Sequence, residues 1–159
     1  MQYYCAIRPG DEMRSLRISD FSFHTSTVTI KNIHAKNNRT ESIAIPAPLM
    51  NILQNHYELQ KYPYDYYVFG KKGCPDTQKI DKNTLRLRHN KFRDQLNITD
   101  EVKLYSWKHS GAQELSNAGI NTYDLCRHLR HKSIVTTEHY IRKRLGEKNE
   151  IIRNNFPDI

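Results

Sequence analysis

Four short segments of the chain combine residue types that can bind or transfer a phosphate. The first holds Arg8, then Pro9 and, one helical turn beyond Arg8, Glu12. Proline suits the first turn of a helix and acidic residues suit its positive end, so a helix is predicted to begin at Pro9. Arg8 then precedes the helix, where it can reach a phosphate while Glu12 orients it. The alternative is a helix-capping segment with an ordinary surface arginine.

The second segment is the polar, asparagine-rich stretch 35–40, which holds Lys36. Its composition is typical of a hairpin tip. A lysine that projects from a hairpin can enter a DNA groove or donate a proton to a leaving oxygen. A solvated loop lysine is the alternative.

The third segment groups Tyr105, Lys108 and His109. Residues three and four apart share one face of a helix, so these side chains can converge. Trp107 is predicted to turn away from them, into the core. An amphipathic helix with incidental polar groups is the alternative.

The fourth segment runs from His131 to Tyr140. Ser133 can cap a helix that reaches about Arg144, which puts His131 before the helix and Tyr140 nine residues later. The chain has ten tyrosines, so a surface tyrosine is the alternative here. The presence of all four segments in one chain argues against coincidence.

The elements that must position these residues fall into two kinds. Short runs with β-branched residues at 21–23, 27–31 and 41–45 predict three strands. Pro46 and Pro48 then open a helix.

Further helical patterns begin at Asp81, at Ser106, which can cap its helix, and at Asn121 and Ser133. Leu85, Arg88, Phe92 and Leu96 share one face of the first. The predicted fold is α+β and mainly α-helical, with a small three-stranded antiparallel sheet packed beside five or six helices.

Composition limits the function. The chain has 159 residues, and 25 Lys and Arg against 17 Asp and Glu give a net charge of +8. That excess favours a polyanionic partner such as nucleic acid, with a merely basic domain as the alternative. No apolar run approaches the roughly 18 residues of a spanning helix, so no membrane partner is expected. Three scattered cysteines without a CxxC pair favour a reducing, cytoplasmic location.

The four segments, in this order, resemble the catalytic domain of the tyrosine recombinase (phage integrase) family over about residues 3–145. The shared order is an arginine near a helix start, a lysine hairpin, a His-x-x-Arg box, and a histidine or tryptophan followed nine residues on by tyrosine. The box departs from the family, because it reads Tyr105-x-x-Lys108. The positions that match are Arg8, Glu12, Lys36, His109, His131 and Tyr140.

The resemblance implies site-specific DNA recombination or integration of a mobile element, without metal or cofactor. The Tyr140 hydroxyl would attack a DNA phosphate to give a 3′-phosphotyrosyl link and a free 5′-hydroxyl. Arg8 and Lys108 would stabilise the added negative charge, His131 would donate to a non-bridging oxygen, and Lys36 would be the general acid.

The resemblance also implies partners and boundaries. Double-stranded DNA is the expected partner, with a monomer when free and a tetrameric synapse on DNA. Residues 1–145 would form a catalytic domain that lacks the family's DNA-clamping arm, and residues 146–159 a tail that can dock on a neighbouring protomer.

Two alternatives stay open. The Tyr105/Lys108 departure favours a catalytically impaired DNA-binding protein on the same fold. A metal-dependent nuclease is disfavoured because the sequence has no HExxH or Cys/His ligand spacing.

Overall fold

The computed structural model describes residues 1–141. Seven α-helices and one three-stranded antiparallel sheet make up this described part, so the predicted α+β class is confirmed. The count exceeds the five or six helices expected because the first helix, α1 (Gln2–Cys5), was not predicted. The predicted end of the last helix near Arg144 and the tail 146–159 lie outside the described residues.

The sheet forms where strands were predicted. A 3₁₀ turn, η1 (Ile18–Asp20), leads into β1 (Phe21–Ser22), and β1 pairs with β2 (Thr27–Ile30). β2 also pairs with β3 (Glu41–Ala44), with Val28 opposite Ile43. Along β2 the side chains alternate between partly exposed threonines and the buried Val28 and Ile30, as the two-residue period of a strand requires.

Helical turns cover the buried side of the sheet. α3 (Ala47–Asn51) starts after Pro46 and continues into a π-helical turn, η2 (Ile52–His56), followed by η3 (Leu59–Lys61). Leu49, Leu53 and Leu59 from these turns pack into one apolar core with the strands. This core also takes in side chains of the first twenty residues, namely Cys5, Ile7, Met13, Leu16 and Ile18.

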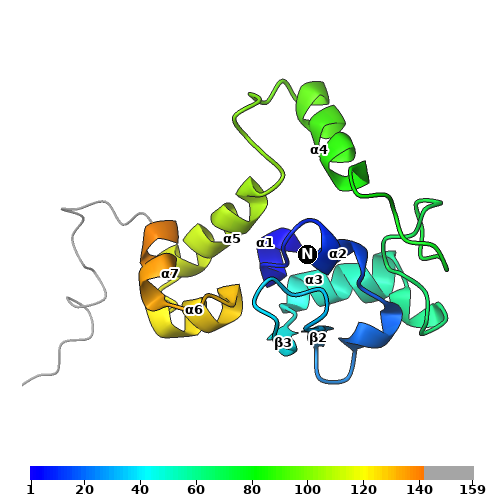
Figure 1. Ribbon diagram of the computed structural model, residues 1–159, viewed down its shortest axis with the longest axis horizontal. Coiled ribbons are helices and arrows are strands. Elements are labelled where there is room, and N and C mark those ends of the chain that lie inside the picture. The colour runs from blue at the N-terminus through cyan, green and yellow to red at the C-terminus, as the bar shows by residue number, and fades with distance from the viewer. Residues whose placement is uncertain (142–159) are drawn as a thin grey trace, which may run out of the picture.

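The helix α4 (Thr84–Gln95) projects away from the rest of the protein (Figure 1). Of the apolar residues predicted on one face of this helix, Leu85 packs against the core, whereas Phe92 and Leu96 are exposed; His89 is the buried residue of the helix.

The three last helices form a separate layer on the opposite side of α1 from the sheet (Figure 1). They are α5 (Ser106–Asn117), α6 (Thr122–Leu129) and α7 (Ile134–Tyr140). Asn121 and Ser133 cap α6 and α7 by accepting bonds from the main-chain N–H groups of Asp124 and Val135. A small apolar cluster joins these helices to the start of the chain and consists of Ala6, Ala112, Leu125, Leu129 and Ile141.

α1 lies directly on α5, and Gly111 makes the approach possible. A Cβ atom at position 111 would lie 2.0 Å from the carbonyl oxygen of Tyr3, a distance no side chain tolerates. This contact brings the N-terminal segment that carries Arg8 against the helices that carry the other candidate site residues.

Three local predictions are wrong. α2 (Asp11–Arg14) begins after Pro9, with Gly10 as its N-cap residue in a positive-φ conformation. Tyr105 rather than Ser106 precedes the first turn of α5. Trp107 is 40% exposed, because the neighbouring Lys108 takes the inward position on the helix.

Candidate active site

Arg8 and Glu12 form the first pair of the site. The Glu12 carboxylate accepts from the main-chain N–H of Arg8 at 2.9 Å and from its Nη1 at 2.8 Å. The Glu12 side chain is 3% exposed and that of Arg8 is 16% exposed. Although burial opposes its charge, the bond and charge of Glu12 raise the pKa of Arg8. Arg8 is therefore a fixed, charged guanidinium at the edge of the interior.

A second guanidinium, which the sequence analysis missed, reaches Glu12 from the other end of the chain. Arg130 Nη2 donates to Glu12 Oε2 at 2.7 Å and to the carbonyl of Ala6 at 3.2 Å. Its own carbonyl lies 3.5 Å from Arg8 Nη2. Burial opposes the Glu12 charge, but the bonds from Arg130 and Arg8 lower its pKa. Glu12 thus links the two ends of the chain as a carboxylate.

Lys108 lies beneath this cluster. Its side chain is fully buried, and Nζ donates to the carbonyl of Leu129 at 3.1 Å. Burial, with the charges of Arg8 and Arg130, lowers the pKa of Lys108 to about 7. Two arginines therefore hold the Glu12 carboxylate and a buried lysine lies nearby, so basic groups outnumber acidic ones here, which favours the binding of an added anion.

The hydroxyl of Tyr140 ends the same network. It donates to the Tyr105 hydroxyl at 2.9 Å, and burial together with this bond raises the pKa of Tyr140. The Tyr105 hydroxyl in turn helps raise the pKa of Arg8. The Tyr140 hydroxyl is therefore bonded to Tyr105, and Tyr105 interacts electrostatically with Arg8, the partner of Glu12.

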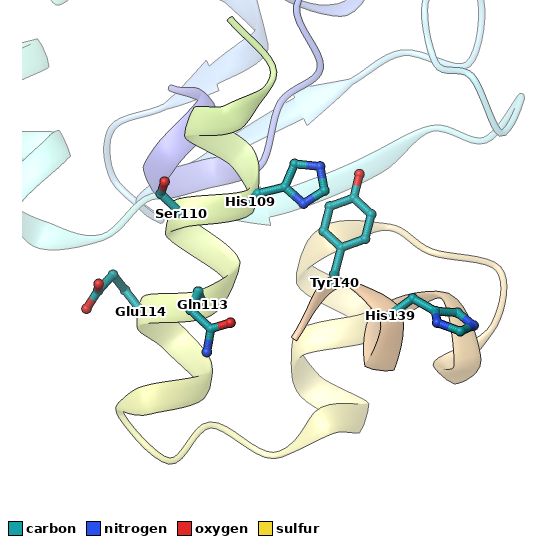
Figure 2. Close-up of a pocket in the computed structure, with 6 residues that line it drawn as sticks. All are labelled: His109, Ser110, Gln113, Glu114, His139 and Tyr140. Atoms are coloured by element: carbon teal, nitrogen blue, oxygen red, sulfur yellow. The ribbon is translucent and has the colours of Figure 1, made fainter. Parts of the chain in front are cut away.

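Two imidazoles flank Tyr140. The His109 ring stacks on the Tyr140 ring at 4.0 Å between centroids, and the two point toward one another from α5 and α7 (Figure 2). The His131 ring meets Tyr140 edge-on at 4.8 Å. His139 lies on the same helix as Tyr140, but its side chain points away from the Tyr140 ring (Figure 2).

His131 is held by the helix that carries Tyr140. Its Nδ1 lies 2.9 Å from the hydroxyl of Thr137, a fully buried residue. Burial and the charges of Lys108 and Arg8 lower the pKa of His131 to about 4. At neutral pH the imidazole is therefore neutral, so it carries one N–H donor and one acceptor nitrogen.

Lys36 adjoins the site through its main chain. Ala35 is buried and anchors the loop between β2 and β3, and the Lys36 N–H donates to Glu12 Oε1 at 3.5 Å. The Lys36 side chain is exposed. The loop thus places an ammonium group on a flexible stem beside the cluster rather than in it.

A basic groove runs from this cluster toward α4. Its lining includes Lys82, Arg86 and Arg93 on one side, and Lys103 and Tyr105 on the other. The four basic residues of this lining would attract phosphates toward Tyr105.

Residues 1–141 were also compared with the requirements for a metal site and for a membrane-spanning helix. The described histidines, cysteines and carboxylates nowhere form a group of three or more placed to hold a metal ion. Likewise, none of the described helices has the length and apolar character needed to cross a membrane.

The sequence profile of the phage integrase family matches residues 1–146. This chain belongs to the phage integrase family. The resemblance seen in the four segments is thereby confirmed, although the match does not test the role of any single residue. A comparison with curated protein sequences gave no match.

Solved structures of recombinases share the fold. The crystal structure of XerA recombinase is 18% identical, with a TM-score of 0.73 over 99% of this chain and 55% of that one. The Tn1549 transposon integrase, in complex with circular intermediate DNA, is 14% identical with a TM-score of 0.74, over 98% of this chain and 57% of that one. XerH recombinase, bound to its difH substrate before cleavage, is 16% identical with a TM-score of 0.67, over 98% of this chain and 44% of that one. This integrase family member thus spans about half the length of these structures.

Proposed function

We propose that this chain cleaves and rejoins DNA strands at specific sites, with Tyr140 as the nucleophile. The observation that carries the proposal is the hydrogen bond from the Tyr140 hydroxyl to Tyr105, which interacts electrostatically with Arg8 of the Arg8–Glu12 pair, in a member of the phage integrase family. The similar transposon integrase and XerH structures, both in complex with DNA, support double-stranded DNA as the substrate.

The reaction needs neither metal nor cofactor. The Tyr140 oxygen attacks the scissile phosphorus and releases its proton to solvent, while the bond from phosphorus to the 5′-oxygen breaks. The products are a 3′-phosphotyrosyl link and a 5′-hydroxyl, with Lys36 giving its proton to the leaving oxygen. A second DNA end reverses the step with its own 5′-hydroxyl, which transfers the strand.

Fixed cations stabilise the transition state of this step. The phosphorane carries more negative charge than the phosphate, so donors held in place before the reaction lower its energy. Arg8 presents a planar fork to two oxygens, and the neutral His131 offers one N–H to a non-bridging oxygen. Lys108 acts from beneath, through its charge, because its ammonium group is bound to the Leu129 carbonyl.

DNA binding is proposed to be mainly electrostatic. The net charge of +8 and the basic groove beside Tyr105 suit the phosphate backbone. Affinity should therefore fall steeply as salt rises. Assembly of four protomers on DNA, as the family resemblance implies, belongs to this proposal.

The test is covalent capture on a nicked duplex, in which the cleaved end diffuses away and traps the phosphotyrosyl link. The Tyr140→Phe variant removes only the hydroxyl, so it should fold and bind DNA but form no SDS-resistant adduct. The matched control is Tyr123→Phe, a change at an exposed tyrosine on α6, which should leave the adduct yield unchanged. Adduct formation by Tyr140→Phe would exclude Tyr140 as nucleophile. DNA binding by the parent chain without any adduct would favour a binding protein on the same fold.

A further inference from the structure

Arg130 is the one buried cation in the described site to which the proposed chemistry gives no role. It is 3% exposed and sits at the C-terminal end of α6, directly before His131. Its Nη2 bonds Glu12 from the side opposite Arg8. The carboxylate is therefore held between two guanidinium groups that come from opposite ends of the described chain.

A purely structural role accounts poorly for an arginine here. The backbone of Arg130 is left-handed, with φ at 57°, a conformation that favours glycine. Its Nε and Nη1 are buried, and neither has a hydrogen-bond partner among residues 1–141. Glu12 would keep both bonds from Arg8 if Arg130 were absent. The protein thus tolerates backbone strain and two unpaired donors to keep a guanidinium at this place.

We propose that Arg130 is a positioning residue for strand cleavage: by sharing Glu12 with Arg8, it fixes the Arg8 guanidinium against the scissile phosphate. The role in cleavage rests on the function proposed above. Lys108 does not substitute for Arg130, because its ammonium group bonds the Leu129 carbonyl, whereas the ion pairs of Glu12 are formed with Arg8 and Arg130. The Ala6 carbonyl gives Arg130 a second anchor, two residues before Arg8. The same side chain therefore holds both the backbone leading to Arg8 and the carboxylate that orients it.

The test uses Arg130→Gly, because glycine suits the positive φ and leaves a cavity of guanidinium size. At saturating nicked DNA, the rate of adduct formation should fall on the order of 10²-fold, since small displacements of an aligned group cost that much. Millimolar guanidinium should enter the cavity and restore the rate to within a few-fold of the parent. Arg127→Gln, at an exposed arginine on the same helix, is the matched control and should need no rescue.

A readout that does not depend on catalysis separates this inference from the proposed function. The ¹⁵N–¹H signal of Arg8 Nε should shift and broaden in Arg130→Gly, and guanidinium should return it toward the parent position. If the parent chain forms no adduct, the proposed function fails while this signal still decides the positioning role.

Unaltered cleavage by Arg130→Gly would overturn the inference, and so would an unaltered Arg8 signal. A loss of cleavage rate that guanidinium does not restore in the folded variant would overturn it as well. Should Arg130→Gly fail to fold, Arg130→Lys keeps the charge but not the fork. It should also displace the Arg8 signal, and an undisturbed signal there would count against the proposal.

Discussion

The sheet side and the last three helices bury very different interiors. The sheet side encloses a continuous apolar core that runs from Cys5 to Leu59. The helices α5 to α7 share only a small apolar cluster, and beside it they bury Lys108, Arg130 and Thr137. The first interior is built from strands and turns that exclude water, whereas the second holds charge that water would otherwise solvate.

The apolar core of the sheet side supplies most of the burial that stabilises the fold, whereas the candidate site groups are concentrated on the helical side. Burying a cation without a full set of partners costs free energy, so the helical side depends on the sheet side to hold it together. Under the proposed function, this interior charge would stabilise the extra negative charge that the scissile phosphate develops. The contact between α1 and α5 at Gly111 is where the stable side supports the reactive one.

Removing the buried charge should have the largest effect. Lys108→Met keeps the length and apolar stem of the side chain but deletes the ammonium group. We expect cleavage to slow on the order of 10²-fold, near the low end for a lost oxyanion donor, because Lys108 acts through its charge. The rate of adduct formation in a single turnover measures the cleavage rate of this variant against that of the parent. Lys61→Met, which removes an exposed lysine on the sheet side, is the control and should cleave like the parent.

Forcing the two sides apart should have the next largest effect. Gly111→Ala adds a methyl group where the Tyr3 carbonyl already lies, and such overpacking costs about 1–3 kcal/mol of unfolding free energy. Ser110→Ala, at an exposed position one residue earlier on α5, should be neutral or slightly stabilising by helix propensity. Urea titrations of the two variants compare them directly. Equal stability of both would show that α1 is not held by this contact.

The buried lysine should also make stability depend on pH. The pKa of Lys108 is about 7 in the folded chain and near its ordinary 10.5 when unfolded, so the unfolded state binds more protons between these values. Unfolding free energy should therefore rise from pH 7 to pH 9, by about 2 kcal/mol from this group. The raised pKa of the Cys5 thiol, about 11, acts in the opposite direction above pH 9, so the comparison ends there.

Lys108→Met should lack this rise. Denaturant unfolding of both chains at pH 7, 8 and 9 isolates the contribution as the difference between them. Parallel curves would mean that Lys108 stays protonated throughout, contrary to the shifted pKa.

The smallest effect should come from Tyr105→Phe, which leaves both interiors intact. The change removes one neutral hydrogen bond, from Tyr140, worth about 1 kcal/mol, so cleavage should slow by only about 5-fold. It should also raise adduct yield at higher pH, because the bond that Tyr140 donates to Tyr105 contributes to the raised pKa of Tyr140. A loss as large as that of Lys108→Met would instead make Tyr105 a direct participant in proton transfer.

Local signals predicted much of the fold. The strands and the caps at Asn121 and Ser133 rest on alternation and on side chains that bond the nearest backbone, so neighbouring residues suffice to find them. α1 escaped prediction because four residues have no periodicity, and its helix depends on the contact with α5. Trp107 was placed wrongly because nothing local shows that a lysine takes the buried position beside it.

In the candidate site, too, local signals found some residues, and contacts between distant parts of the chain hid others. Arg8, Glu12, Tyr105, His109, His131 and Tyr140 come together as the order of the four segments suggested, although their roles stay predictions. Arg130 was missed because an arginine at a helix end is usually a solvated cation that interacts with the helix dipole. Its one local signal is its position directly after α6, where glycine is preferred. The partner that buries it, Glu12, is far away in sequence.

The ion pair between Glu12 and Arg130 joins residues 118 positions apart. Closing so long a loop is entropically costly, and contacts of this separation form late in folding. During synthesis Arg8 leaves the ribosome first, while Arg130, His131 and Tyr140 emerge near the end of the described chain. An incomplete chain therefore carries Arg8 without Tyr140, so under the proposed function a truncated product lacks the nucleophile and cannot form the phosphotyrosyl link.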